Sequence, residues 1–259
     1  TGDGFRELTL RDPEGNLVEL CSRVAPEPHY GVRAVLFDLD GTLIDSEENY
    51  YRADCQLLAR RGIEFRESDK RRYIGGSNLD MMVDLVRRFG FPETPSALVA
   101  EKNELYMEIA RQQTRPYPEM KRFWNLIRGR GIPVGVVSGS SPAVIHELLT
   151  VVGLADQAQV IVSAEEVERG KPAPDAFLEA AQRLGVSPEH CVVVEDSRYG
   201  VEAARRAFMR CIAVPYLHDE PLDEAFGFAD LLFARGMEDF DADLAMKWVD
   251  AESGDDKSG

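Results

Sequence analysis

Two aspartates, Asp38 and Asp40, follow a short apolar run and are separated by a single residue. The apolar residues 34–37 suit a buried strand, because short apolar runs that stop at turn residues are typical of parallel sheets. Two carboxylates at the exit of such a strand lose solvation, which a bound cation or a catalytic role would offset. Taken alone, the stretch also fits a strand followed by an ordinary acidic turn through Gly41 and Thr42.

Polar residues also follow three later apolar segments. They are Ser138, Gly139 and Ser140, then Lys171 before Pro172, and finally Glu195 and Asp196. In isolation, Ser138 fits a turn former and Lys171 fits a solvated loop lysine. The adjacent acids Glu195 and Asp196 are harder to explain in this way, since like charges at a strand end repel each other without a cation.

Together these residues suit phosphoryl transfer with a divalent cation. Asp38, Glu195 and Asp196 offer hard oxygen ligands of the kind that Mg²⁺ binds. Asp38 can attack phosphorus as a nucleophile, and Asp40 can protonate the leaving oxygen and later accept a proton from water. The groups expected to hold the phosphate oxygens are Ser138, the backbone amide of Gly139, Ser140 and Lys171.

Strands alternate with helices over residues 116–235, which indicates βαβ units and a parallel, doubly wound α/β sheet covered on both faces. The expected strands are residues 32–38, 133–137, 160–162, 191–194, 212–214 and 231–233. Ligands of such sheets bind beyond the carboxyl ends of the strands. The polar residues that follow the strands are therefore expected to meet at one edge.

Residues 47–115 read as helices throughout, with Ser46 as the expected N-cap and the clearest helical spacing over 78–89 and 97–109. We predict that this helical bundle forms a cap domain. It would be inserted into a core domain made of residues 31–46 and 116–235, so that the core is discontinuous in sequence.

The two ends of the chain differ from this pattern. Residues 1–30 contain two strand-like runs around a strong turn signal and resemble the closing hairpin of glyoxalase-type modules, in which the acid at the Glu19 position binds metal. A lone hairpin lacks the other strands of such a site, so an appendage docked on the main domain is expected instead. Residues 236–259 read as an acidic tail, with a helix followed by a loose end.

The composition narrows the class of protein. The chain has 259 residues and a formal net charge of −16, which argues against a nucleic-acid or anionic-membrane surface. Four scattered cysteines, without any C-x-x-C pair, fit reduced thiols better than a disulfide framework or a zinc site. No apolar stretch has spanning length. We expect a cytoplasmic protein, either a monomer or a dimer.

The four motifs resemble those of the haloacid dehalogenase (HAD) superfamily of phosphohydrolases, over residues 32 to about 235: Asp38-x-Asp40-Gly41-Thr42, Ser138, Lys171-Pro172 and Glu195-Asp196. The resemblance implies a Rossmann-like core, obligatory Mg²⁺, an aspartyl-phosphate intermediate and a mobile helical cap. It makes Asp38 the nucleophile and Asp40 the general acid/base. It also implies that the metal is held by Asp38, the backbone carbonyl of Asp40, Glu195 and Asp196. The presence of Asp40 argues against the halide-releasing and phosphonate-cleaving members.

Residues of the cap bear on the branch within the superfamily. The sugar-phosphate mutases are similar around Lys171 and Glu195, but they carry a histidine where Tyr50 aligns and an arginine where Asn78 aligns. Of their three polar cap groups only the lysine, Lys102, is kept. We therefore predict a Mg²⁺-dependent phosphatase acting on a small phosphorylated metabolite such as a sugar phosphate. A β-phosphoglucomutase-like mutase and an inactive binding protein on the same fold are the alternatives.

The identity of the substrate is expected to depend on polar and small residues of the cap. They are Gly75, Gly76, Ser77, Asn78 and Lys102.

Overall fold

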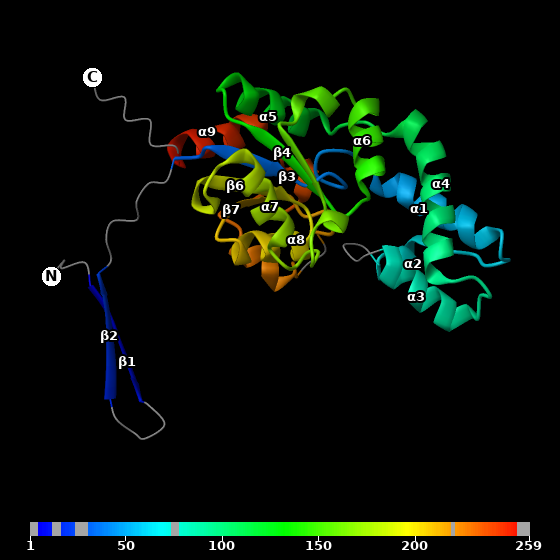
Figure 1. Cartoon of the computed structure of the whole chain (residues 1–259), viewed down its shortest axis with the longest axis horizontal. Coiled ribbons are helices and arrows are strands. Elements are labelled where there is room, and N and C mark those ends of the chain that lie inside the picture. The colour runs from blue at the N-terminus through cyan, green and yellow to red at the C-terminus, as the bar shows by residue number, and fades with distance from the viewer. Residues whose placement is uncertain (1–4, 12–16, 24–30, 74–77, 219–220, 253–259) are drawn as a thin grey trace.

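A six-stranded parallel sheet forms the centre of the computed structural model, which describes residues 5–11, 17–23, 31–73, 78–218 and 221–252 (Figure 1). The strands are β3 (Ala34–Phe37), β4 (Val134–Ser138), β5 (Val160–Ser163), β6 (Cys191–Glu195), β7 (Arg210–Ala213) and β8 (Leu231–Leu232). Their order across the sheet is β5-β4-β3-β6-β7-β8, so the first strand of the sheet lies between β4 and β6. The predicted doubly wound α/β sheet is confirmed.

Helices cover both faces of the sheet, which explains why the strands are apolar except at their ends. The helices on one face are α5 (Pro118–Gly129), α6 (Pro142–Val151) and α9 (Ala242–Glu252), and those on the other are α7 (Asp175–Leu184) and α8 (Arg198–Arg206). Along β3, Val35 and Phe37 are buried in the first layer and Ala34 and Leu36 in the second. Short 3-10 helices lie at Ala155–Gln157, Ala164–Glu166, Pro188–His190, Glu224–Phe228 and Gly236–Glu238.

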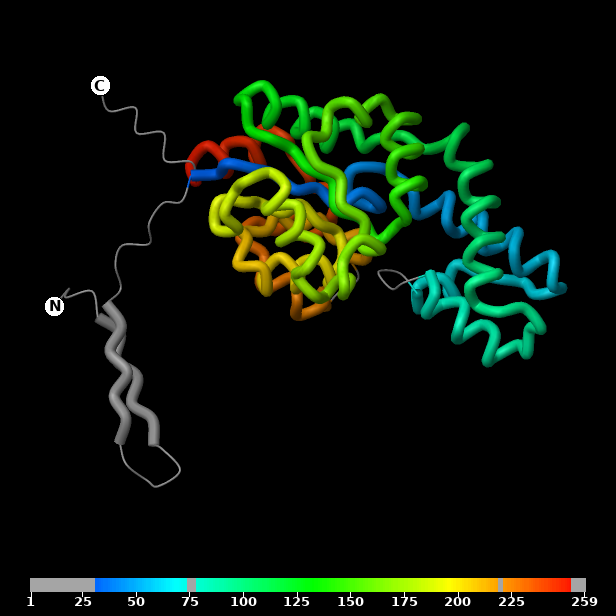
Figure 2. The backbone as a smooth tube through the Cα atoms, in the orientation of Figure 1, coloured from blue at the N-terminus to red at the C-terminus, as the bar shows by residue number. Residues whose placement is uncertain are grey.

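A helical cap lies beside the sheet and is formed by the segment between β3 and β4 (Figure 2). Its helices are α1 (Glu47–Ala59), α2 (Glu67–Lys70), α3 (Asn78–Phe89) and α4 (Pro95–Gln113). The two segments that join cap and core run side by side: Asp45 N donates to Arg115 O at 3.0 Å, and Tyr117 N donates to Leu43 O at 3.2 Å. The helix α4 begins two residues earlier than predicted, because Thr94 caps it and Pro95 fits the first turn.

The segment after residue 235 is more integrated than the predicted acidic tail. Up to Glu252 it packs on the sheet layer, and the ring of Phe240 lies 5.8 Å from that of Phe123. In α9 the residues Ala242, Ala245, Met246 and Val249 are buried. The acids lie on the outer face, where Asp243 and Asp250 pair with arginines of the α5 region. The acidic composition of this segment does not reveal the apolar stripe that α9 buries.

The N-terminal hairpin is present as predicted: β1 (Phe5–Arg11) and β2 (Leu17–Arg23) pair antiparallel, with Thr9 opposite Glu19. A metal role of Glu19 and a docked appendage remain untested predictions. In the part of the chain that the structure describes, every helix is too short or too polar to cross a membrane.

Candidate active site

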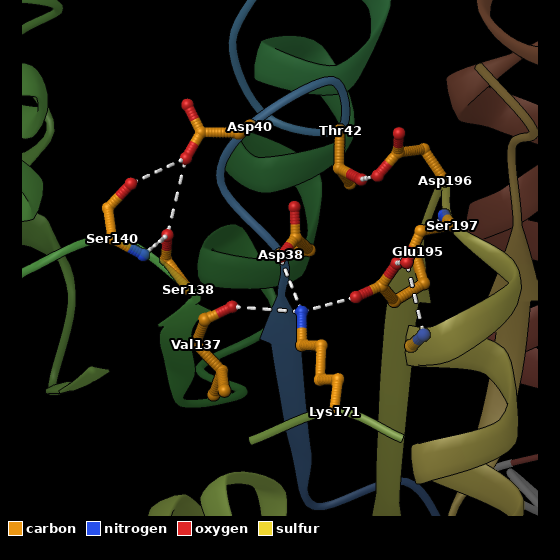
Figure 3. A network of polar contacts seen from close by, with 11 residues as sticks. Asp38, Asp40, Thr42, Val137, Ser138, Ser140, Lys171, Glu195, Asp196 and Ser197 are labelled. Carbon is orange, nitrogen blue, oxygen red and sulfur yellow. Dashed lines mark hydrogen bonds and ion pairs between the residues drawn. The ribbon is translucent and has the colours of Figure 1, made fainter. Parts of the chain in front are cut away.

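Three neighbouring strands and one loop bring the predicted catalytic side chains together (Figure 3). Asp38 directly follows β3, Ser138 is the last residue of β4, and Glu195 is the last residue of β6. Lys171 reaches the same place from the connection between β5 and α7. Because adjacent parallel strands end at the same edge, the order of the sheet accounts for this convergence.

Lys171 lies between two carboxylates. Its Nζ atom is 2.5 Å from Asp38 Oδ1 and also pairs with Glu195 Oε1. Burial acts to lower the pKa of Lys171, but the charges of Asp38 and Glu195 outweigh it, so the pKa rises and the amine stays protonated. Burial also raises the pKa of Asp38 well above its usual value, although Lys171 opposes this shift.

Three buried acids form a cluster that suits a divalent cation. Carboxylate oxygens of Asp38, Glu195 and Asp196 lie within 4.8 Å of one another. Burial, and then the charges of Glu195 and Asp38, raise the pKa of Asp196 well above its usual value. Such a cluster carries more negative charge than Lys171 can balance. Oxygen ligands in this number and charge fit Mg²⁺, which balances that charge when it is bound.

Neighbouring groups fix the orientation of these acids. Thr42 Oγ1 donates to Asp196 Oδ1 at 3.0 Å, and the backbone amide and hydroxyl of Ser197 donate to Glu195 Oε2 at 2.9 and 3.0 Å. Gly200 leaves the space that Glu195 occupies, since a Cβ atom there would lie 1.8 Å from the carboxyl carbon. These contacts leave little freedom for either carboxylate.

Asp40 is held by hydroxyl groups and not by a charge. Its Oδ2 accepts from Ser138 Oγ at 3.3 Å and from Ser140 Oγ at 3.1 Å. Ser140 Oγ is in turn 3.1 Å from the hydroxyl of Tyr50 in the cap. Burial raises the pKa of Asp40, while both serine hydroxyls act to lower it. A carboxyl group with a raised pKa is suited to donate a proton and later to take one back.

A cavity of about 490 Å³ extends from these acids to the cap. The predicted binding residues Gly139, Ser140, Asn78 and Lys102 lie on its wall. Gly75, Gly76 and Ser77 fall outside the described residues, so their predicted role stays a prediction.

Sequence reasoning missed six polar residues of the cap that also line the cavity. They are Glu47, Asp54, Lys70, Tyr73, Asn103 and, as a contributor to the site, Tyr50. The spacing of Glu47, Tyr50 and Asp54 on α1 is i, i+3 and i+7, which places them on one face of a helix. That spacing was the available signal. Lys70 ends the short helix α2 and carries no comparable signal.

Comparisons with known proteins agree with this geometry. The sequence profile of haloacid dehalogenase-like hydrolases matches residues 32–207. The chain is 32% identical over 185 residues to the fructose-1-phosphate phosphatase YqaB of Escherichia coli K12. The alignment covers 71% of this chain and 96% of that protein. Hexitol phosphatase B of the same strain is 33% identical over 190 residues, covering 71% of this chain and 84% of that protein.

The fold is also shared with solved structures. CbbY from Rhodobacter sphaeroides, in complex with phosphate, superposes with a TM-score of 0.72 at 24% identity and covers 80% of this chain and 95% of its own. The motifs, the fold and the named phosphatase relatives lead to one conclusion. The chain belongs to the haloacid dehalogenase-like hydrolases, as a phosphoric monoester hydrolase of that family.

Proposed function

We propose that the chain hydrolyses a small phosphorylated metabolite, most simply a sugar phosphate, through a covalent phosphate on Asp38. The observation that carries this proposal is that Asp38 is paired with Lys171 and clustered with Glu195 and Asp196, while the carboxylate of Asp40 is held by serine hydroxyls of the same site. The named relatives that act on fructose 1-phosphate and on hexitol phosphates support a sugar phosphate.

In the first step a carboxylate oxygen of Asp38 attacks phosphorus and the bond from phosphorus to the leaving oxygen breaks. Asp40 gives its proton to that oxygen, so the alcohol leaves neutral. Ser138, the amide of Gly139 and Lys171 bind the phosphate oxygens and offset the charge that develops on them. In the second step Asp40, now a carboxylate, takes a proton from water, and the water oxygen attacks phosphorus and releases Asp38.

Asp38, the backbone carbonyl of Asp40, Glu195 and Asp196 would hold Mg²⁺. When bound, the cation supplies positive charge that offsets the phosphate and the clustered acids. The burial of Asp38, Glu195 and Asp196 in one cluster supports this set, since together they carry more negative charge than Lys171 balances.

A mutase activity is the less favoured alternative. A mutase must hold a bisphosphate intermediate and turn it over, and it uses basic groups of the cap for this. Where its histidine aligns, Tyr50 stacks on Tyr106 with ring centroids 3.9 Å apart and hydrogen-bonds to Ser140. Unlike a histidine, a tyrosine does not become positively charged, and burial moves the pKa of Tyr50 still further above its usual value.

The test is a panel of phosphate esters with release of inorganic phosphate as the readout, run with Mg²⁺ and with a chelator. We expect release with Mg²⁺ that the chelator abolishes. The products are then identified, and free sugar with free phosphate is expected. Interconversion of sugar phosphates that depends on a bisphosphate activator would instead establish the mutase.

A further inference from the structure

The cap half of the cavity carries two lysines, and each is paired with an acid. Lys102 pairs with Asp54 and Lys70 pairs with Glu47, and all four line the cavity. The third lysine of the wall, Lys171, belongs to the phosphate end. If the charges of Lys70 and Lys102 are already neutralised by their partners, neither lysine can bind a second negatively charged group of the substrate.

The pair of Lys102 and Asp54 is buried, with side chains only 3% and 4% exposed and an N–O distance of 2.7 Å. Lys102 also donates to Asn78 Oδ1 at 2.9 Å and lies 5.4 Å from the centre of the Tyr50 ring. Breaking such a pair leaves a buried charge without compensation, which is costly. The charge of Lys102 is therefore neutralised within the cap and is not available to bind an anion.

Lys70 is compensated in a similar way. Its Nζ atom lies 3.0 Å from Glu47 Oε2 and also donates to the backbone carbonyl of Glu47. The rings of Tyr51 and Tyr216 lie 5.9 and 5.6 Å from it. Its side chain is 9% exposed.

Among the residues that the structure describes, the basic side chains that line the cavity are Lys70, Lys102 and Lys171, so this half of the described wall has no further positive charge. In the sequence, residues 74–77 are Ile-Gly-Gly-Ser and include no charged residue. A second phosphate, with a charge of about −1.5 to −2 at neutral pH, would meet Glu47 and Asp54 without a spare cation.

We infer that the cap half receives an uncharged, hydroxyl-bearing group, and that the Asp54–Lys102 pair determines this specificity. The inference rests on the proposed function and narrows it. The substrate is a monophosphate of a sugar or polyol, and not a bisphosphate or a phosphorylated acid. Carboxylate oxygens accept hydrogen bonds from substrate hydroxyls, and the side-chain amide nitrogen of Asn78 can donate to them. A site built for neutral hydroxyls rejects anions through the acids it exposes to them.

The experiment measures kcat/KM for fructose 1-phosphate and sorbitol 6-phosphate against fructose 1,6-bisphosphate and phosphoglycolate, at saturating Mg²⁺. The wild type is expected to prefer the two monophosphates with neutral ends by about tenfold or more. Asp54→Asn releases the charge of Lys102 while keeping the shape of the side chain. It should reduce that preference by about tenfold, chiefly by lowering KM for the two anionic substrates.

Two further variants keep the test decisive. Glu101→Gln removes an acid of the cap that pairs with Arg60 and Arg61 away from the cavity, and it should leave the preference unchanged. If Asp54→Asn does not fold, as judged by circular dichroism, the double variant Asp54→Asn with Lys102→Met replaces it. This variant has no charge at either position, so the part of the preference that the acid Asp54 provides should be lost, and binding of sorbitol 6-phosphate should weaken.

The failures are distinguishable. No turnover of any ester, including an aryl phosphate, would overturn the proposed function itself. Turnover of bisphosphate as fast as monophosphate by the wild type would overturn only the specificity inference. A folded Asp54→Asn protein with unchanged preference, or a double variant that keeps the full preference, would also overturn the inference.

Discussion

The two ends of the cavity hold their acids in different ways. At the core end Asp38, Asp40, Glu195 and Asp196 face a single lysine, and burial raises the pKa of Asp38 and Asp196 well above their usual values. At the cap end two acids face two lysines in separate pairs. An unbalanced cluster calls for a cation from outside, whereas a balanced one has no such need. The two ends of the cavity therefore differ in charge balance: the core end, where we propose that the reaction occurs, is unbalanced, and the cap end, where we propose that the substrate is recognised, is balanced.

Removing the nucleophile gives the largest expected effect at the core end. Asp38→Asn should lower kcat by about 10⁴-fold or more, because the covalent step loses its attacking oxygen. The measurement is release of phosphate from an aryl phosphate with Mg²⁺. Asp156→Asn makes the same change far from the site and should keep full activity. A rate for Asp38→Asn within tenfold of the wild type would rule out a covalent route through this residue.

Removing one acid of the unbalanced cluster should affect activity and stability in opposite directions. Asp196→Asn should lower activity by about 10²-fold or more, yet raise the stability of the metal-free protein on the order of 1 kcal/mol, which is about 2–4 °C in Tm. The reason is that repulsion among three buried carboxylates is relieved. Phosphate release with Mg²⁺ measures the activity, and thermal unfolding with and without Mg²⁺ measures the stability. The gain in Tm from Mg²⁺ should shrink in the variant.

The same cluster predicts how stability depends on pH. The fold raises the pKa of Asp196, so the folded state holds protons that the unfolded state releases above about pH 3.8. The stability of the metal-free wild type should therefore fall as pH rises from that value. Asp196→Asn should flatten this dependence, and a metal-free Tm that rises steadily over the same range would contradict the assignment.

A methyl group beside Glu195 should disturb the site without removing any catalytic group. Gly200→Ala puts a Cβ atom 1.8 Å from the carboxyl carbon of Glu195, which must then move. We expect a loss of about 1–3 kcal/mol in unfolding free energy and weaker Mg²⁺ binding, measured by titration of activity. Gly129→Ala meets nothing within 4 Å and is the matched control. Unchanged Mg²⁺ affinity in Gly200→Ala would show that Glu195 does not need this position.

The smallest expected effect concerns the protonation of Asp40. Ser140→Ala removes a hydroxyl that donates to its carboxylate, and that hydrogen bond acts to lower the pKa of Asp40. Without it the pKa rises further, so Asp40 remains an acid to higher pH. The alkaline limb of kcat/KM should move upward in pH at saturating Mg²⁺. Thr150→Ala, a similar loss of a hydroxyl on α6, should leave the limb in place.

The core end could be predicted from the sequence because its acids and Ser138 lie at or just after the ends of apolar strands. Asp38, Ser138 and Glu195 sit beside a pattern that predicts their place, and the rules of parallel sheets then bring them to one edge. The doubly wound sheet and its inserted helices followed from the same pattern.

The cap end of the cavity was much harder to predict from the sequence. The partners Asp54 and Lys102 lie on different helices, and no local pattern states that α1 and α4 would set them face to face. The space at Gly200 and the buried stripe of α9 likewise depend on packing between distant segments. Sequence periodicity predicts single helices and strands. It does not predict which of them pack together, so contacts between elements could be identified only in the structure.

The central position of β3 has a consequence for synthesis of the chain. Val35 pairs with Val134 on one side and with Val192 on the other, and the entire cap is made between β3 and the first of these partners. A ribosome therefore releases the nucleophile first and the acids at Glu195 and Asp196 long afterwards. A nascent chain that ends before β6 carries Asp38 and a complete cap but none of the remaining cluster. The cluster that we propose to bind Mg²⁺ is therefore completed only when β6 has been made and has paired with β3, the strand that was made first.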